Sequence, residues 1–149
     1  MAVNFALASM TQGLWWDEAV YLSLAKNIAH VGNYKINSES FYKLSDIRFT
    51  SEEVVDESYR PPLFPYVLSA FASSTNFIFI ARYISVLFTV LALPAVYVLG
   101  KKIFDGKIGF VASFILGSNM LFIFFGQKIL TESFFALLST LFLFTYFVA

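Results

Sequence analysis

Long apolar runs dominate the second half of this chain, and their lengths predict helices that cross a membrane. A helix that spans a bilayer needs about 20 predominantly apolar residues. Residues 77–100 and 108–126 reach that length, although Pro94 should kink the first of these helices. Two shorter apolar runs occupy residues 1–14 and 132–149, at the two ends of the chain. We expect both to be truncated spans, and the chain to be an N-terminal fragment of a longer protein.

Two other segments are better suited to lying on a membrane than to crossing it. Apolar residues recur at helical spacing over residues 17–31, with Asp17 as the expected cap and Gly32 as the stop signal. Residues 61–74 are also apolar, but fourteen residues of helix measure only about 21 Å. Both are therefore predicted to be interfacial helices within an external loop that covers residues 15–76.

The charged positions predict which side of the membrane each segment faces. Residues 33–59 are polar and aperiodic, which predicts an extramembrane loop with a short strand or helix. Lys101, Lys102 and Lys107 follow the first full span and are opposed only by Asp105. Lysine-rich loops face the cytoplasm. The acidic region before that span should then lie outside, together with the end of the second span.

Composition supports an integral membrane protein and excludes several other classes. Only 13% of the 149 residues are charged and 58% are hydrophobic, whereas soluble domains carry about 25% charged residues. There is no cysteine, so this chain cannot form disulfides or use thiol chemistry. The net charge is zero and no basic stripe is present, so we expect no nucleic-acid partner. The predicted fold class is all-α, with several transmembrane helices, in the plasma membrane.

Three short motifs occur in an order and spacing that resemble a known family. They are WDEAVY at residues 16–21, YRPPLFP at residues 59–65 and LTE at residues 130–132. Together they resemble the C-type, multi-spanning glycosyltransferases, in particular the protein O-mannosyltransferases and the lipid A aminoarabinose transferases. The resemblance covers essentially the whole chain and corresponds to the beginning of those enzymes.

The resemblance implies transfer of a sugar from a polyprenyl-phosphate donor to an acceptor protein, lipid or glycan on the extracytoplasmic face. Such a transfer needs a carboxylate base near the acceptor and a cation near the leaving phosphate. Asp17 matches the family's acidic residue of the first external loop, which is commonly assigned as the base. Arg60 matches the basic residue before the two prolines and would bind the donor phosphate, where arginine can donate two parallel hydrogen bonds.

The resemblance also implies further substrate-binding residues. Glu18 and Tyr21 belong to the first motif, Glu132 to the third, and Lys128 shortly precedes it. Glu132 would orient groups in the site or bind a metal. Divalent metal use varies across these families, and with His30 as the only histidine and no metal-ligand spacing we predict no definite cofactor.

Each of these residues also has an ordinary structural interpretation. Asp17 can be a helix cap worth about 1 kcal/mol, and Glu18 an ordinary first-turn acid. Arg60 and Arg82 can be interfacial arginines whose charged ends reach water. For the whole chain the alternatives are a non-catalytic membrane subunit or transporter fragment, and a short protein that keeps only the beginning of the family. The fragment alone is expected to be inactive.

Overall fold

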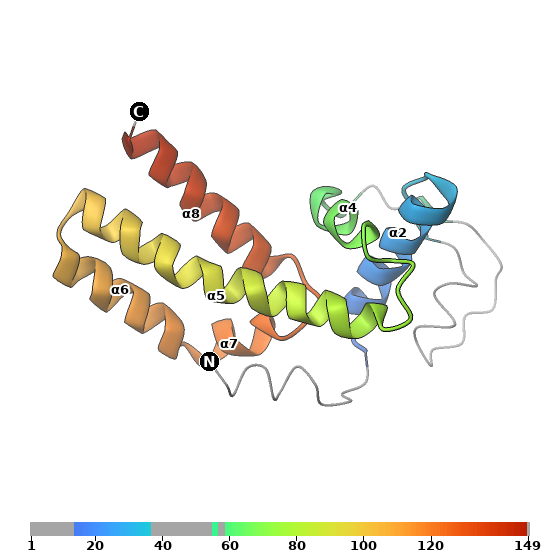
Figure 1. The fold of residues 1–149 in the computed structure, drawn as a ribbon, viewed down its shortest axis with the longest axis horizontal. Coiled ribbons are helices and arrows are strands. Elements are labelled where there is room, and N and C mark those ends of the chain that lie inside the picture. The colour runs from blue at the N-terminus through green and yellow to red at the C-terminus, as the bar shows by residue number, and fades with distance from the viewer. Residues whose placement is uncertain (1–13, 37–54, 57–58, 149) are drawn as a thin grey trace. The chain divides into compact units, whose positions relative to one another are not determined.

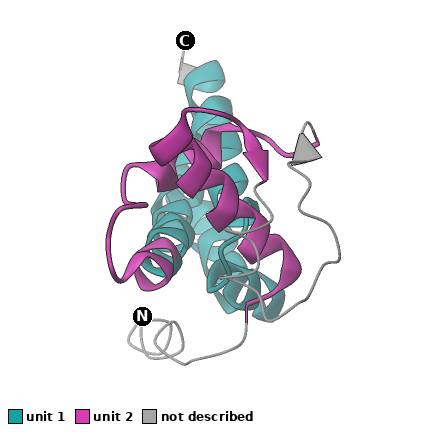
Figure 2. Cartoon of the chain, turned by 90° about the vertical axis from the view of Figure 1, so that its right-hand side faces the viewer, with its two compact units in different colours: residues 1–9, 82–149 teal, residues 10–81 magenta. Residues whose placement is uncertain are grey.

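The computed structural model describes residues 14–36, 55–56 and 59–148, and these are mostly helical (Figure 1). The chain divides into two compact units, one of residues 10–81 and one of residues 1–9 and 82–149 (Figure 2). We call them unit 2 and unit 1 and describe each by itself. The expected span at residues 1–14 and most of the polar loop lie outside the described residues. The described elements are α2 (Trp16–Val31), β1 (Lys35–Ile36), β2 (Val55–Asp56), α4 (Leu63–Ser69), α5 (Phe77–Ile103), α6 (Gly106–Ser118), α7 (Met120–Gly126) and α8 (Glu132–Val148).

Helix α2 starts and ends for identifiable local reasons. Trp15 is the N-cap residue, and its backbone N–H donates to the Glu18 carboxylate over 2.9 Å. Our expectation that Asp17 caps this helix is therefore wrong, because Asp17 already lies in the first turn and Glu18 makes the capping contact. Gly32 ends the helix as expected, with a φ of 74° that glycine adopts without strain, and its N–H donates to Asn27.

Unit 2 has a conventional apolar core between α2 and its neighbours. Ala19, Val20 and Leu24 are fully buried, and Tyr34 and Ile36 pack against them. Strand β1 pairs with β2 in antiparallel register, so a short strand does interrupt the polar loop as predicted. The expected division of α2 into an apolar and a polar face is only partly observed, because Asn27 is 5% exposed whereas Val31 is 65% exposed. Asn27 is buried because its side-chain amide donates to the backbone carbonyl of Lys35.

Helix α4 is shorter than the segment 61–74 that we expected to be helical. It comprises seven residues, or about 10 Å, and begins after Pro62. Phe64, Pro65 and Leu68 are its buried residues. A helix of this length cannot cross a bilayer, which agrees with our prediction that this segment is not a span.

Helix α5 is long and apolar enough to cross a membrane. It has 27 residues, and an 18-residue stretch within it has a mean hydropathy of 2.0; at 1.5 Å per residue the helix is about 40 Å long. It continues through Pro94 and ends three residues beyond the predicted boundary at residue 100. Among the residues described, this is the one unbroken helix that meets both conditions.

The predicted span at residues 108–126 is divided into two helices. Helices α6 and α7 are bent by 64° at Asn119, so a single continuous span was a wrong expectation. Asn119 causes the break because its extended backbone ends α6, while its side chain accepts a hydrogen bond from Phe122 N at 3.0 Å and caps α7. The two helices can form one broken span, and α8, which begins at Glu132 as predicted, is a shorter apolar helix.

Unit 1 buries small and hydroxyl-bearing residues together with a few larger ones such as Val86, Ile129 and Leu137, while most of its large apolar residues lie outside. Thr89 donates to the carbonyl oxygens of Ser85 and Gly126 at 2.9 and 3.4 Å, and Ser133 donates to the Ser85 carbonyl at 3.4 Å. Ser113 of α6 likewise donates to the carbonyl of Leu93 in α5 at 2.9 Å. Small residues and hydroxyl hydrogen bonds between helices are typical of helix packing within membranes.

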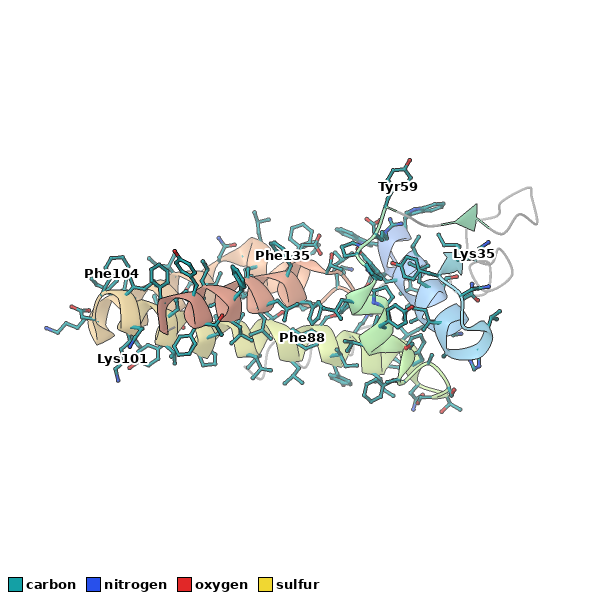
Figure 3. All side chains as sticks on the ribbon, turned by 90° about the horizontal axis from the view of Figure 1, so that it is seen from above. Lys35, Tyr59, Phe88, Lys101, Phe104 and Phe135 are labelled. Carbon is teal, nitrogen blue, oxygen red and sulfur yellow. The ribbon has the colours of Figure 1, made fainter. Side chains whose placement is uncertain are left out.

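The outer surface of unit 1 consists largely of Phe, Leu, Ile and Val side chains. Phe114 is 65% exposed, Phe135 71% and Phe142 70%. Figure 3 shows Phe135 projecting from α8 and Phe104 projecting just beyond the end of α5. Exposed apolar surface of this extent marks contact with a membrane or a partner. Together with the hydropathy of α5, it favours lipid around unit 1.

Two glycines allow α5 and α6 to approach closely at their hairpin. A Cβ added to Gly109 would lie 2.6 Å from the backbone oxygen of Tyr97, and one added to Gly100 would lie 2.7 Å from the Cα of Gly109. Both contacts involve backbone atoms, so a larger residue at either position would force the helices apart. Asp105 caps α6 between them by accepting a 2.7 Å hydrogen bond from Ile108 N.

Candidate functional site

An ion pair joins two residues that the resemblance singled out 43 positions apart in the chain. The guanidinium of Arg60 donates to a carboxylate oxygen of Asp17, in the first turn of α2. The Asp17 side chain is 52% exposed and that of Arg60 is 20% exposed. A carboxylate and a guanidinium therefore meet at a surface that solutes can reach, and both belong to unit 2.

The position of Arg60 is fixed by two aromatic residues. Its guanidinium carbon lies 5.5 Å from the centre of the Tyr21 ring, which is a cation–π contact. The Tyr34 hydroxyl donates to the Arg60 backbone carbonyl at 3.0 Å. Tyr21 in turn packs edge-to-face against Phe64 of α4, with ring centroids 5.5 Å apart. Two contacts from different segments thus hold the arginine beside Asp17.

The contact with Asp17 is made through a single terminal nitrogen of the Arg60 guanidinium. A guanidinium carries five N–H groups in one plane, and this geometry matches the oxygens of a carboxylate or a phosphate. Pro61 and Pro62 connect Arg60 to α4 and restrict the backbone conformation at this connection.

Glu18 has a structural function in this arrangement. It is fully buried, and its carboxylate accepts the hydrogen bond from Trp15 N that caps α2. The capping fixes the first turn of the helix, and therefore the position of Asp17. Its predicted contact with substrate stays a prediction.

Lys128 and Glu132 lie in unit 1, in and after the turn that joins α7 to α8. Lys128 is 4% exposed, and its ammonium lies 5.8 Å from the centre of the Phe124 ring. Glu132 is exposed in the first turn of α8, where an acidic residue is favoured by the helix dipole. Asp17, Glu18, Tyr21 and Arg60 therefore come together in unit 2, whereas the other two predicted residues belong to the other unit.

The sequence analysis missed Tyr34, which follows α2 in the chain and whose hydroxyl donates to the Arg60 backbone carbonyl. The signal was weak, because Tyr34 is an isolated aromatic residue in a polar stretch and belongs to none of the three motifs. A metal site was left open, and within the described residues no group of three or more His, Asp or Glu side chains could hold an ion.

The fold and this cluster define a helical protein with a candidate membrane span and an exposed carboxylate–guanidinium pair beside it in the sequence. No family model, no curated protein and no solved structure matches the chain.

Proposed function

We propose that this chain is part of a multi-pass membrane glycosyltransferase. It transfers a sugar from a polyprenyl-phosphate donor to a protein, lipid or glycan acceptor on the extracytoplasmic face of the plasma membrane. The observation that carries the proposal is the contact between Asp17 and Arg60, the two residues to which the three-motif resemblance assigns the chemistry.

The reaction needs a base and an anion-binding group close together. Asp17 accepts the proton of the acceptor hydroxyl or amine as that atom attacks the anomeric carbon of the sugar. The bond from the anomeric carbon to the phosphate oxygen breaks, and the phosphate leaves with the electron pair. Arg60 binds this phosphate, and the configuration of the sugar is inverted. Glu18 positions Asp17 through the helix cap, while Tyr21 and Tyr34 position Arg60.

The test is sugar transfer by the complete protein in membranes, with Asp17→Asn as the variant. Radiolabelled polyprenyl-phosphate mannose and polyprenyl-phosphate aminoarabinose serve as donors, and label is measured in the protein and lipid fractions. Loss of the base should lower transfer by about a hundredfold or more. Asp105→Asn is the matched control, because it makes the same chemical change at the α6 cap, where asparagine caps as well as aspartate.

A charge exchange separates catalysis from structure. The double variant Asp17→Arg with Arg60→Asp can rebuild the ion pair with its ends reversed. If the pair acts in catalysis, the double variant is folded but inactive. Recovery of transfer in the double variant, or near-normal transfer by Asp17→Asn, would instead assign the pair to structure. Absence of transfer by the unaltered protein with either donor would favour a non-catalytic membrane subunit.

A further inference from the structure

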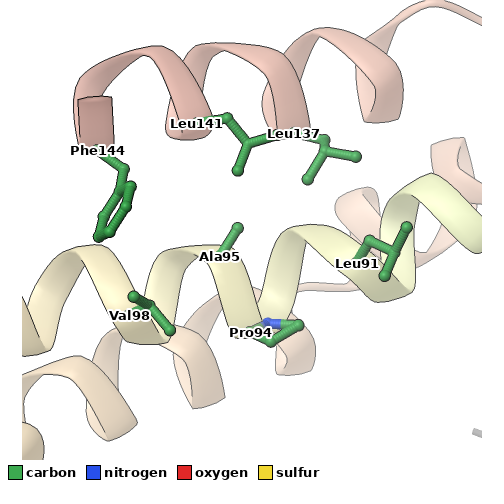
Figure 4. Close-up of a pocket in the computed structure, with 7 residues that line it drawn as sticks. All are labelled: Leu91, Pro94, Ala95, Val98, Leu137, Leu141 and Phe144. Carbon is green, nitrogen blue, oxygen red and sulfur yellow. The ribbon is translucent and has the colours of Figure 1, made fainter. Parts of the chain in front are cut away.

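An apolar groove lies between α5 and α8, and none of its lining residues takes part in the proposed sugar transfer. Its volume is 380 Å³, and all of its lining side chains are apolar (Figure 4). On one side it is lined by Leu91, Pro94, Ala95 and Val98 of α5, and on the other by Leu137, Leu141 and Phe144 of α8. The N-terminal end of α8 is joined to the first half of α5 by the Ser133–Ser85 hydrogen bond and the Phe88–Phe134 contact. The groove lies beyond these contacts, toward the C-terminal ends.

The α5 side of the groove continues directly into two lysines. Its lining residues recur at helical spacing and form one stripe along the helix. Lys101 and Lys102 follow Val98 by three and four residues, so they flank the continuation of that stripe one turn further on. Both lysines are exposed. Asp105, the one acidic residue nearby in the sequence, has a carboxylate oxygen occupied by the α6 cap.

The dimensions match half a bilayer. The twelve residues from Leu91 to Lys102 rise about 17 Å along α5. The hydrocarbon core of a bilayer is about 30 Å thick, so one leaflet occupies about 15 Å. When the lysines lie at the level of the headgroups, the far end of the apolar groove at Leu91 therefore lies near the middle of the bilayer.

We propose that this groove binds one acyl chain of an anionic phospholipid, whose phosphate lies between Lys101 and Lys102. Because lysine-rich loops face the cytoplasm, the lipid belongs to the cytoplasmic leaflet. The chain of the lipid fills the space between α5 and α8 and covers their facing apolar side chains. The proposal depends on membrane placement of unit 1 and not on the sugar-transfer reaction.

The test compares two lipids that differ only in the headgroup. The delipidated protein in detergent is titrated with dioleoyl phosphatidylglycerol or dioleoyl phosphatidylcholine, and bound lipid is counted by native mass spectrometry. We expect one phosphatidylglycerol to be retained about tenfold more tightly than phosphatidylcholine, because each lysine attracts an anionic headgroup. Equal affinity for the two lipids, or retention of neither, would overturn the proposal.

Variants assign the binding to this groove. Lys101→Gln with Lys102→Gln should remove the preference for phosphatidylglycerol, and Ala95→Trp should fill the groove and weaken binding of both lipids. The controls are Lys107→Gln, in the same basic loop but on α6, and Val111→Trp, at an exposed position of α6 outside the groove. An equal effect of Lys107→Gln would mean diffuse attraction to the basic loop and would contradict a defined site.

A measurement on the unaltered protein does not depend on the folding of variants. Phosphatidylglycerol with a photoreactive group on its acyl chain is cross-linked to the protein, and the modified peptides are mapped. The proposal predicts modification within residues 91–98 and 137–144. Modification spread evenly over the apolar helices would contradict it.

Discussion

The two units of this chain use the same apolar residue types in opposite ways. In unit 2, Leu24 and Phe64 are buried, and the Asp17–Arg60 pair lies toward solvent. In unit 1, Ser85 and Thr89 are buried, while Phe114 and other large apolar side chains are exposed. Leucine and phenylalanine stabilise the first unit by leaving water. In the second unit most of them face outward, and the helices associate through glycine contacts and hydroxyl hydrogen bonds beside a few buried apolar side chains such as Ile129 and Leu137.

The two units would have different surroundings if, as we propose, unit 1 lies in a membrane. Burial of apolar surface stabilises a fold only when the surroundings are water, because lipid chains are as apolar as leucine itself. Close packing around small residues then remains as the main attraction between helices. Unit 1 has this pattern, and unit 2 has the pattern of a water-facing or interfacial region, with Trp15 and Trp16 partly exposed as interfacial tryptophans commonly are.

The largest effect is expected from truncation of a buried leucine in unit 2. Leu24→Ala removes a fully buried side chain from the cluster with Ala19 and Val20, and should lower the free energy of unfolding by about 3 kcal/mol. Leu87→Ala is the matched change in unit 1, where the side chain is 52% exposed, and should cost less than about 1 kcal/mol. Denaturant unfolding in detergent, followed by circular dichroism, measures both. Equal losses would contradict the contrast between the units.

A charge on the outer surface of unit 1 should have a comparable effect for a different reason. Phe114→Arg places a guanidinium on the exposed apolar face of α6, which would cost about 3 kcal/mol near the centre of a membrane span if unit 1 lies in a membrane as we propose. The control is Tyr59→Arg in unit 2, at a side chain that is 94% exposed, and its stability should stay within about 0.5 kcal/mol of the parent. The fraction of protein recovered in the membrane distinguishes them. If Phe114→Arg is tolerated as well as Tyr59→Arg, the outer face of unit 1 is in water.

A smaller effect is expected where unit 1 needs a glycine. Gly109→Ala places a Cβ against the backbone of α5 at the hairpin, and should destabilise unit 1 by about 2 kcal/mol. Gly106→Ala, in the first turn of the same helix, meets nothing within 4 Å and should be near neutral. Thermal unfolding of the two variants in the same detergent gives the comparison. If Gly109→Ala unfolds at the same temperature as the parent protein, close α5–α6 packing does not stabilise unit 1.

The sequence predicted most of the helices but not their interruptions. The apolar runs placed α5 and the start of α8 within a few residues, because hydrophobic length is read directly from sequence. The break at Asn119 was missed because apolar residues continue on both sides of it, although asparagine is a common helix cap and could have indicated it. The short α4 was overestimated because apolar character alone does not determine where a helix ends.

The site could be predicted only as a set of residues, not as an arrangement. The motifs selected Asp17 and Arg60, but a contact across 43 positions depends on how α2, the polar loop and α4 fold together. For the same reason the sequence did not reveal that Glu18 positions Asp17 through the helix cap, or that Tyr34 positions Arg60 through a hydrogen bond. Local capping rules came closest, since they placed the start of α2 within two residues, although they assigned the cap to Asp17 and not to Trp15 and Glu18.

The most direct test of the membrane arrangement is the labelling of single cysteines, which have no background because the chain contains none. Ser73→Cys in unit 2, Lys107→Cys in the basic loop and Phe114→Cys on α6 are exposed positions for a membrane-impermeant maleimide on intact cells. We predict that the cysteine at 73 is labelled at once, the one at 107 only after permeabilisation, and the one at 114 in neither case. Labelling of 73 and 107 from the same side, or rapid labelling of 114, would contradict a membrane-spanning unit 1.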